Sequence, residues 1–121
     1  MAIQKVLVVD DSKTEIMFMT DLLVKNGFTV RSAENAEDAF RKLAEEKPDL
    51  ILMDVVMPGL NGFQATRQIS KAPETAHIPI FMCTTKDQET DKVWGQRQGA
   101  KDYLVKPVNG DELLAKIAAL G

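Results

Sequence analysis

Apolar residues along the chain follow two alternating patterns, short continuous runs and stretches with helical spacing. Continuous runs of this length are typical of strands that are covered on both faces, as in parallel sheets. Five segments carry them: Lys5–Asp10, Phe28–Ala33, Leu50–Asp54, Ile78–Thr84 and Asp102–Lys106. The second segment, FTVRSA, alternates more than the others and predicts a weaker strand near an edge of the sheet.

Helical spacing predicts a helix after each of these runs. Three apolar stripes are clear: Ile16, Met19, Leu22 and Leu23; Ala36, Ala39, Phe40, Leu43 and Ala44; and Leu113, Leu114, Ile117 and Ala118. Asn35 and Asn109 precede the second and third stripes as N-caps, and Asn26-Gly27 ends the first helix. The segments 62–70 and 88–100 fill the two remaining helical positions less regularly. This alternation indicates an α/β fold, a doubly wound parallel sheet with helices on both faces.

Composition narrows the classes of protein that remain. The 121 residues, 45% of them hydrophobic, suffice for one core, so we expect a single domain over residues 1–121. A net charge of −3 offers no basic surface for nucleic acid. No apolar run approaches the roughly 20 residues that span a bilayer, and no secretory signal follows Met1. With Cys83 as its lone cysteine, the chain is expected to be cytoplasmic, without membrane insertion.

Polar residues collect where the predicted strands end. Four of the five runs finish in such residues: Asp10 and Asp11, Asp54, Thr84 and Thr85, and Lys106. In an open parallel sheet these ends lie on the same side, where ligands bind in the crevice at which the strand order reverses. Residues up to about 95 positions apart are therefore expected to meet in one pocket. Each residue alone could equally be a cap, a strand end or a loop residue, so the argument depends on their joint placement.

The chemistry of this pocket favours a cation and a phosphoryl group. Two carboxylates about 4 Å apart repel by roughly 4 kcal/mol at an effective dielectric constant of about 20, so a positive charge is expected beside them. Clustered carboxylates, with His77 elsewhere, favour Mg²⁺. Lys106 and Thr84 can both donate hydrogen bonds to phosphoryl oxygens. Asp54 is the best-placed nucleophile, since a carboxylate can accept a phosphoryl group as an aspartyl phosphate.

Four ordered motifs, VLVVDDS, LILMDVVMPGLNG, PIFMCTTK and GAKDYLVKP, resemble the receiver domain of bacterial two-component response regulators. The resemblance covers essentially the whole chain and implies a flavodoxin-like (βα)5 fold with strand order 2-1-3-4-5. It makes Asp54 the phosphoacceptor, with Thr84 and Lys106 binding the phosphoryl group. It also implies a Mg²⁺ site, whose ligands would be Asp10, Asp11, Asp54 and the main-chain carbonyl of Val56.

The resemblance extends to the switch and its partners. Thr84 and Tyr103 match the residues that change position on phosphorylation, and Lys106-Pro107 matches a bond that is cis in the family. A histidine kinase or histidine phosphotransfer domain would donate the phosphoryl group. A downstream protein would bind the face formed by the fourth helix, fifth strand and fifth helix. We expect a stand-alone regulator without an output domain, not an enzyme beyond its own phosphorylation and dephosphorylation.

Two segments, MPGLNGFQATR and TTKDQETDKVWGQRQGAKDYL, look most similar to the small regulators of the chemotaxis-like system that controls twitching by type IV pili. General chemotaxis regulators share the same architecture. Thr85 stands where the family usually has alanine, which could narrow access to Asp54. Val56 and Lys86 occupy variable positions that tune the lifetime of the aspartyl phosphate.

Other functions fit the sequence less well. A phosphatase with an aspartyl nucleophile needs a second aspartate two positions later, where Val56 stands. Neither GxGxxG nor GxxxxGK[ST] is present, which argues against nucleotide binding. A docking module that keeps the fold but is never phosphorylated stays possible, although the acidic pair, Thr84 and Lys106 argue against it. Two interpretations of Trp94 stay open: partial packing in the core, or contact with a partner protein.

Overall fold

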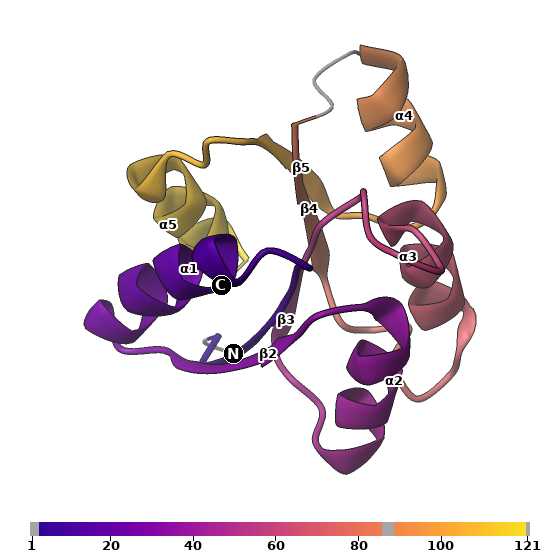
Figure 1. Cartoon of the computed structure of the whole chain (residues 1–121), viewed down its shortest axis with the longest axis horizontal. Coiled ribbons are helices and arrows are strands. Elements are labelled where there is room, and N and C mark those ends of the chain that lie inside the picture. Colours follow the sequence, from indigo (N-terminus) through magenta and orange to yellow (C-terminus); the bar gives the residue numbers. More distant parts are fainter. Residues whose placement is uncertain (1–2, 86–88, 121) are drawn as a thin grey trace.

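The computed structural model describes residues 3–85 and 89–120, except for the side chain of Glu89. Strands and helices alternate as the apolar pattern predicts (Figure 1). The strands are β1 (Lys5–Val9), β2 (Thr29–Ala33), β3 (Leu50–Met53), β4 (Ile80–Thr84) and β5 (Asp102–Val105). The helices are α1 (Lys13–Lys25), α2 (Ala36–Glu45), α3 (Gly62–Lys71), α4 (Glu89–Arg97) and α5 (Gly110–Ala119).

The strands form one parallel sheet in the order β2-β1-β3-β4-β5, which confirms the expected fold and strand order. The register aligns the carboxyl ends of the strands: Val9 pairs with both Ala33 and Met53, and Thr84 pairs with Val105. β2 lies at an edge, and only its last residue is fully buried, so the weaker pattern of FTVRSA is explained by its position.

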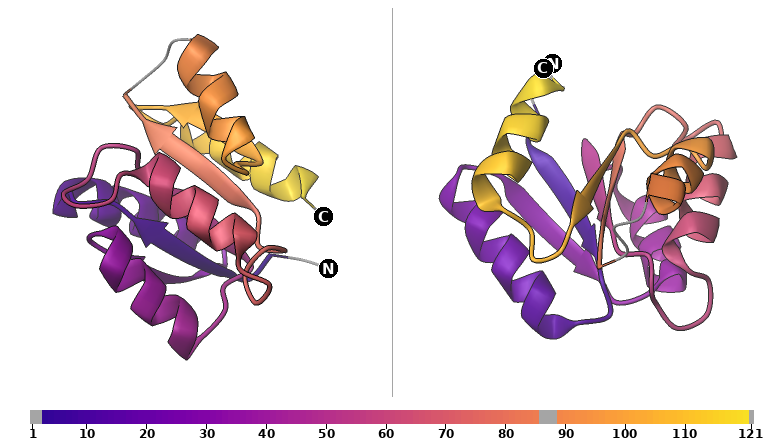
Figure 2. Two further views of the ribbon diagram at one scale, coloured as in Figure 1. Left: turned by 90° about the vertical axis from the view of Figure 1, so that its right-hand side faces the viewer. Right: turned by 90° about the horizontal axis from the view of Figure 1, so that it is seen from above.

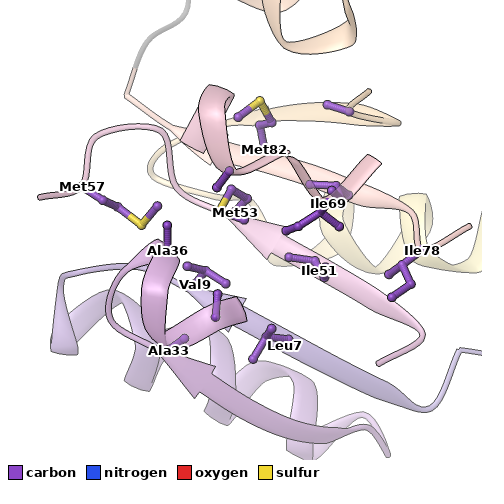
Figure 3. Packing of buried hydrophobic residues seen from close by; sticks show 14 of the residues in the cluster. Leu7, Val9, Ala33, Ala36, Ile51, Met53, Met57, Ile69, Ile78 and Met82 are labelled. Carbon is purple, nitrogen blue, oxygen red and sulfur yellow. The ribbon is translucent and has the colours of Figure 1, made fainter. Parts of the chain in front are cut away.

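Helices cover both faces of the sheet, and each face has its own apolar core. α1 and α5 lie on one face, and α2, α3 and α4 lie on the other (Figures 1 and 2). Successive residues of β1 contribute to opposite sides: Val6 and Val8 pack with α1 and α5, whereas Leu7 and Val9 pack with α2 and α3 (Figure 3). All four are at most 3% exposed, as the continuous apolar run predicts for a central strand.

The helix ends are formed by the predicted residues. The Oδ1 atom of Asn35 accepts the backbone N–H of Asp38 at 2.8 Å, and that of Asn109 accepts the N–H of Glu112 at 2.9 Å. Gly27 follows the C-cap Asn26 with φ +90, a left-handed conformation that glycine adopts without strain. No helix in the described part of the chain combines the length and apolar character needed to cross a bilayer.

Candidate functional site

The functional side chains are positioned by a continuation of the sheet's hydrogen bonding. One residue beyond β1, the N–H of Asp10 donates to the carbonyl of Ala33 at 3.0 Å. The N–H of Asp54 donates to the carbonyl of Val9 at 2.9 Å, and that of Lys106 donates to the carbonyl of Thr84 at 2.8 Å. The three side chains therefore emerge at the same edge of the sheet.

This edge carries the expected acidic cluster. One carboxylate oxygen from each of Asp10, Asp11 and Asp54 lies within 4.8 Å of the others. Asp10 and Asp54 are buried, at 5% and 6% exposure, whereas Asp11 is exposed. Carboxylates from two separate strand ends thus converge, as the sequence predicts, and Asp11 is the member of the cluster that faces solvent.

Lys106 supplies a positive charge inside the cluster. Its Nζ atom lies 2.6 Å from Oδ2 of Asp10 and 3.4 Å from Oδ1 of Asp54. The lysine side chain is only 11% exposed, so both ion pairs are largely shielded from water. In this structure the ammonium group therefore offsets the repulsion that two adjacent buried carboxylates would otherwise suffer, and it pairs more closely with Asp10 than with Asp54.

The surroundings of the ion pair shift the pKa values of both Asp54 and Lys106. Burial raises the pKa of Asp54 from 3.8 to about 6, and the charge of Asp10 adds to the increase, although Lys106 opposes it. Burial by itself would lower the pKa of Lys106, but its hydrogen bond to Asp10 and the two carboxylate charges outweigh burial and raise it. Lys106 consequently stays charged, whereas ionised Asp54 is less stable in the folded protein than in the unfolded chain.

The raised pKa of Asp54 predicts that Asp54→Asn stabilises the metal-free protein. Because the folded-state pKa exceeds the unfolded value of 3.8, ionisation between about pH 4 and pH 6 costs stability. The variant should gain about 1–3 kcal/mol near pH 7.5, and the gain should shrink as the pH falls toward 4. Urea unfolding at the two pH values measures this difference. An equal gain in stability at both pH values would contradict the raised pKa of Asp54 as its cause.

Two residues that support the site were missed by sequence reasoning. Ser12 donates its backbone N–H to Oδ1 of Asp10 at 2.9 Å, and its hydroxyl accepts the N–H of Glu15 as the N-cap of α1. Gly62, the first residue of α3, lies so near the site that an added Cβ would be 2.0 Å from the carbonyl oxygen of Asp54. A serine after the acidic pair is a recognisable capping signal. No sequence signal marks the contact at Gly62.

The remaining predicted residues differ in how far they are buried. Thr84 ends β4 and is fully buried, and Tyr103 on β5 is 8% exposed. Val56 and Thr85 are both exposed, Val56 at 59%. The Lys106-Pro107 bond is cis, as expected. Lys86 lies outside the described residues.

Two further residues considered in the sequence are Cys83 and Trp94. Cys83 is buried, and this burial raises the pKa of its thiol to about 12. The ring of Trp94 makes an edge contact with Phe63 at 6.5 Å between centroids and is 49% exposed, so it packs in part against the domain. Contact of Trp94 with a partner stays a prediction.

The donor set at this edge suits a hard divalent cation. Carboxylate oxygens are preferred by Mg²⁺, which retains several water ligands and so needs an open side such as the one at Asp11. The ammonium group of Lys106 lies beside both Asp10 and Asp54, so an anionic group attached to the Asp54 carboxylate would have a positive charge and the other carboxylates of the cluster nearby. The arrangement can therefore support phosphoryl transfer to a carboxylate.

A parallel sheet of this order with an acidic pocket and a lysine at its carboxyl edge defines a response regulator receiver domain. The family model for the response regulator receiver domain matches residues 6–118, and the chain belongs to this family. Membership makes it a phosphoacceptor signalling module of two-component systems rather than a catalytic enzyme, as the sequence predicted, and implies a partner kinase.

Individual relatives agree with this assignment. The chain is 58% identical to Protein PilH of Pseudomonas aeruginosa over 116 residues, which cover 96% of both chains. It is 38% identical to the alkaline phosphatase synthesis transcriptional regulatory protein PhoP of Bacillus subtilis, of which the match covers 48%. Among solved structures, the chemotaxis protein CheY4 of Vibrio cholerae superimposes with a TM-score of 0.91 at 32% identity, covering 98% of each chain.

Proposed function

We propose that Asp54 accepts a phosphoryl group from a phosphohistidine of a histidine kinase or histidine phosphotransfer domain. The observation that carries the proposal is the convergence of three carboxylates with Lys106 at one edge of the sheet. A carboxylate oxygen of Asp54 forms the new bond to phosphorus while the bond from phosphorus to the imidazole nitrogen breaks. The imidazole keeps the electron pair of the broken bond.

The chain's own groups position and stabilise the transferred phosphoryl group. Asp10, Asp11, Asp54 and the main-chain carbonyl of Val56 would hold Mg²⁺. When bound, Mg²⁺ neutralises charge on the phosphoryl oxygens. Lys106, already 3.4 Å from Asp54, donates to a phosphoryl oxygen, and the hydroxyl of Thr84 donates to another. Asp10, which pairs with Lys106 at 2.6 Å, would also be a ligand of Mg²⁺, whose charge would compete with Lys106 for this carboxylate.

The signal leaves through protein contacts. Phosphorylation draws Thr84 toward the new group and favours the buried position of Tyr103, which shifts the population of two conformations of the face formed by α4, β5 and α5. We place this activity in the cytoplasm, in the chemotaxis-like pathway of type IV pilus twitching. The resemblance of two long segments to regulators of that pathway and the 58% identity to Protein PilH support this placement.

Incubation with acetyl phosphate tests the phosphoacceptor proposal without knowledge of the kinase. The full chain should gain one phosphoryl group by intact-mass spectrometry when Mg²⁺ is present. The label should disappear with EDTA and be released by hydroxylamine, as an acyl phosphate requires. A chain that binds no phosphoryl group under these conditions, and also fails to bind Mg²⁺ and beryllofluoride, would instead be the docking module considered above.

A further inference from the structure

α4 is attached to the rest of the domain with very little buried surface. Among its residues with described side chains, Gly95 is the one buried position, and it contributes no side chain. Its large apolar residues, Val93 and Trp94, are 40% and 49% exposed. α3, on the same face of the sheet, buries Ala65, Thr66 and Ile69 in addition to Gly62. The apolar contacts that normally anchor a helix are therefore nearly absent from α4.

Gly95 instead allows the helix backbone to approach the sheet closely. A Cβ at this position would lie 2.9 Å from Sδ of Met82, 3.4 Å from Cδ2 of Tyr103 and 3.5 Å from Cε1 of Phe63. Met82 is fully buried on β4, in the core shown in Figure 3, so its side chain has little room to move away. The same backbone segment covers the ring of Tyr103, which is 8% exposed.

A second glycine fixes the end of α4. Gly99 has φ +112, and a Cβ there would lie 2.2 Å from Oγ of Ser70 at the end of α3. Directly before Gly95, the helix contacts α3 through the edge contact of Trp94 with Phe63. Three contacts thus hold α4 against the domain: the close backbone approaches at Gly95 and Gly99, four residues apart, and the aromatic contact of Trp94. We call these three contacts the seat of α4.

We propose that Gly95 is a positioning residue that sets how firmly α4 is seated and how stably Tyr103 is buried beneath it. With no side chain at 95, the helix closes over Met82 and the tyrosine ring. A larger residue must displace one of them or lift the helix, which frees α4 and exposes the ring. Residue 95 thereby determines the balance between a seated and a lifted α4, a balance that needs no ligand or phosphoryl group.

Its connection with signalling rests on the proposed function. There, phosphorylation favours buried Tyr103, so a residue that disfavours the buried ring must also weaken binding of a phosphoryl mimic, because coupling between two sites is reciprocal. The size of the side chain at position 95 is then expected to change how strongly α4 responds to phosphorylation of Asp54, without altering the acidic pocket.

Hydrogen exchange of the 121-residue chain tests how firmly α4 is held. In Gly95→Val, the α4 amides should exchange at least about ten-fold faster than in the wild type, since overpacking outweighs any gain in helix propensity. Helix propensity alone predicts slower exchange, because glycine is the poorer helix former. Gln96→Val, which introduces the same side chain at the exposed neighbouring position, should leave exchange nearly unchanged. Equal or slower exchange in Gly95→Val would overturn the proposal.

A double-mutant cycle identifies the contact responsible. Met82→Val removes the sulfur atom that lies nearest to the added Cβ, so Gly95→Val should accelerate α4 exchange several-fold less in that background. An undiminished effect would show that the close approach to Met82 is not the cause. Exchange of the β1 amides in every variant reports on global folding and separates a lifted helix from an unfolded domain.

Binding of Mg²⁺ and beryllofluoride tests the connection with Asp54. The affinity of Gly95→Val should fall about five-fold, while Gln96→Val binds like the wild type. An unchanged affinity in Gly95→Val would refute the coupling between residue 95 and the Asp54 site. The proposed effect of residue 95 on α4 would then depend on the exchange data alone. If the wild type itself fails to bind the mimic, the proposed function fails instead.

Discussion

An Asp54→Asn variant is expected to lose Mg²⁺-dependent phosphorylation by acetyl phosphate down to the level of a blank reaction. The amide keeps the shape of the carboxylate but has no anionic oxygen with which to attack phosphorus. Since the replacement also removes a buried charge whose pKa is raised to about 6, the inactive variant should be more stable than the wild type. Loss of labelling therefore cannot come from unfolding. Intact-mass spectrometry measures the label and urea unfolding measures the stability.

A matched control keeps the chemistry of the substitution but moves it away from the pocket. Asp21 is an exposed carboxylate on α1, and Asp21→Asn should be labelled like the wild type. Peptide mapping of the labelled wild-type chain should place the phosphoryl group on the segment that contains Asp54. Mg²⁺-dependent labelling that persists in Asp54→Asn would show that another carboxylate, such as Asp10 or Asp11, is the acceptor.

The sequence predicted the elements and the convergence of the polar residues because both follow from short-range patterns and one topological rule. The continuous apolar run of β1 requires cover on both faces, and the structure buries Val6 to Val9 accordingly. Once the strands are parallel, their ends must share an edge, so Asp10, Asp54 and Lys106 meet without any further information. The helix caps Asn35 and Asn109 depend only on residues three positions apart and were equally accessible.

What the sequence did not reveal depends on distances of a few ångströms between elements. Lys106 was expected beside a phosphoryl group on Asp54, but in this structure its Nζ atom pairs more closely with Asp10. The choice between two carboxylates is set by the side-chain conformation within the folded pocket, which leaves no trace in the spacing of residues. The shallow packing of α4 is similarly invisible, since the sequence left two interpretations open for Trp94 and the structure leaves both Val93 and Trp94 exposed.

Of the contacts that the sequence did not reveal, the one between Gly62 and the segment that carries Asp54 leaves the least space. Gly62→Ala is therefore expected to destabilise the protein by about 3 kcal/mol or more. The added Cβ would lie 2.0 Å from the carbonyl oxygen of Asp54 and 2.8 Å from Cα of Val55. Both are backbone atoms that cannot rotate away, and the N–H of Gly62 also donates to the carbonyl of Val55 at 2.8 Å. Relief therefore requires α3 to move away from the segment that carries Asp54.

Gly110→Ala provides a control with the same local structure. Gly62 and Gly110 are each the first residue of a helix and each follow an asparagine N-cap, Asn61 or Asn109. At Gly110, however, the added Cβ would lie 3.2 Å from Cδ1 of Leu22, the end of a flexible side chain that can shift. Urea unfolding should therefore place Gly110→Ala within about 1 kcal/mol of the wild type. Gly62→Ala should also be labelled more slowly by acetyl phosphate, because Asp54 is displaced. Equal stability of the two variants would mean that the backbone at Asp54 yields easily, and that the position of the phosphoacceptor is not fixed by α3.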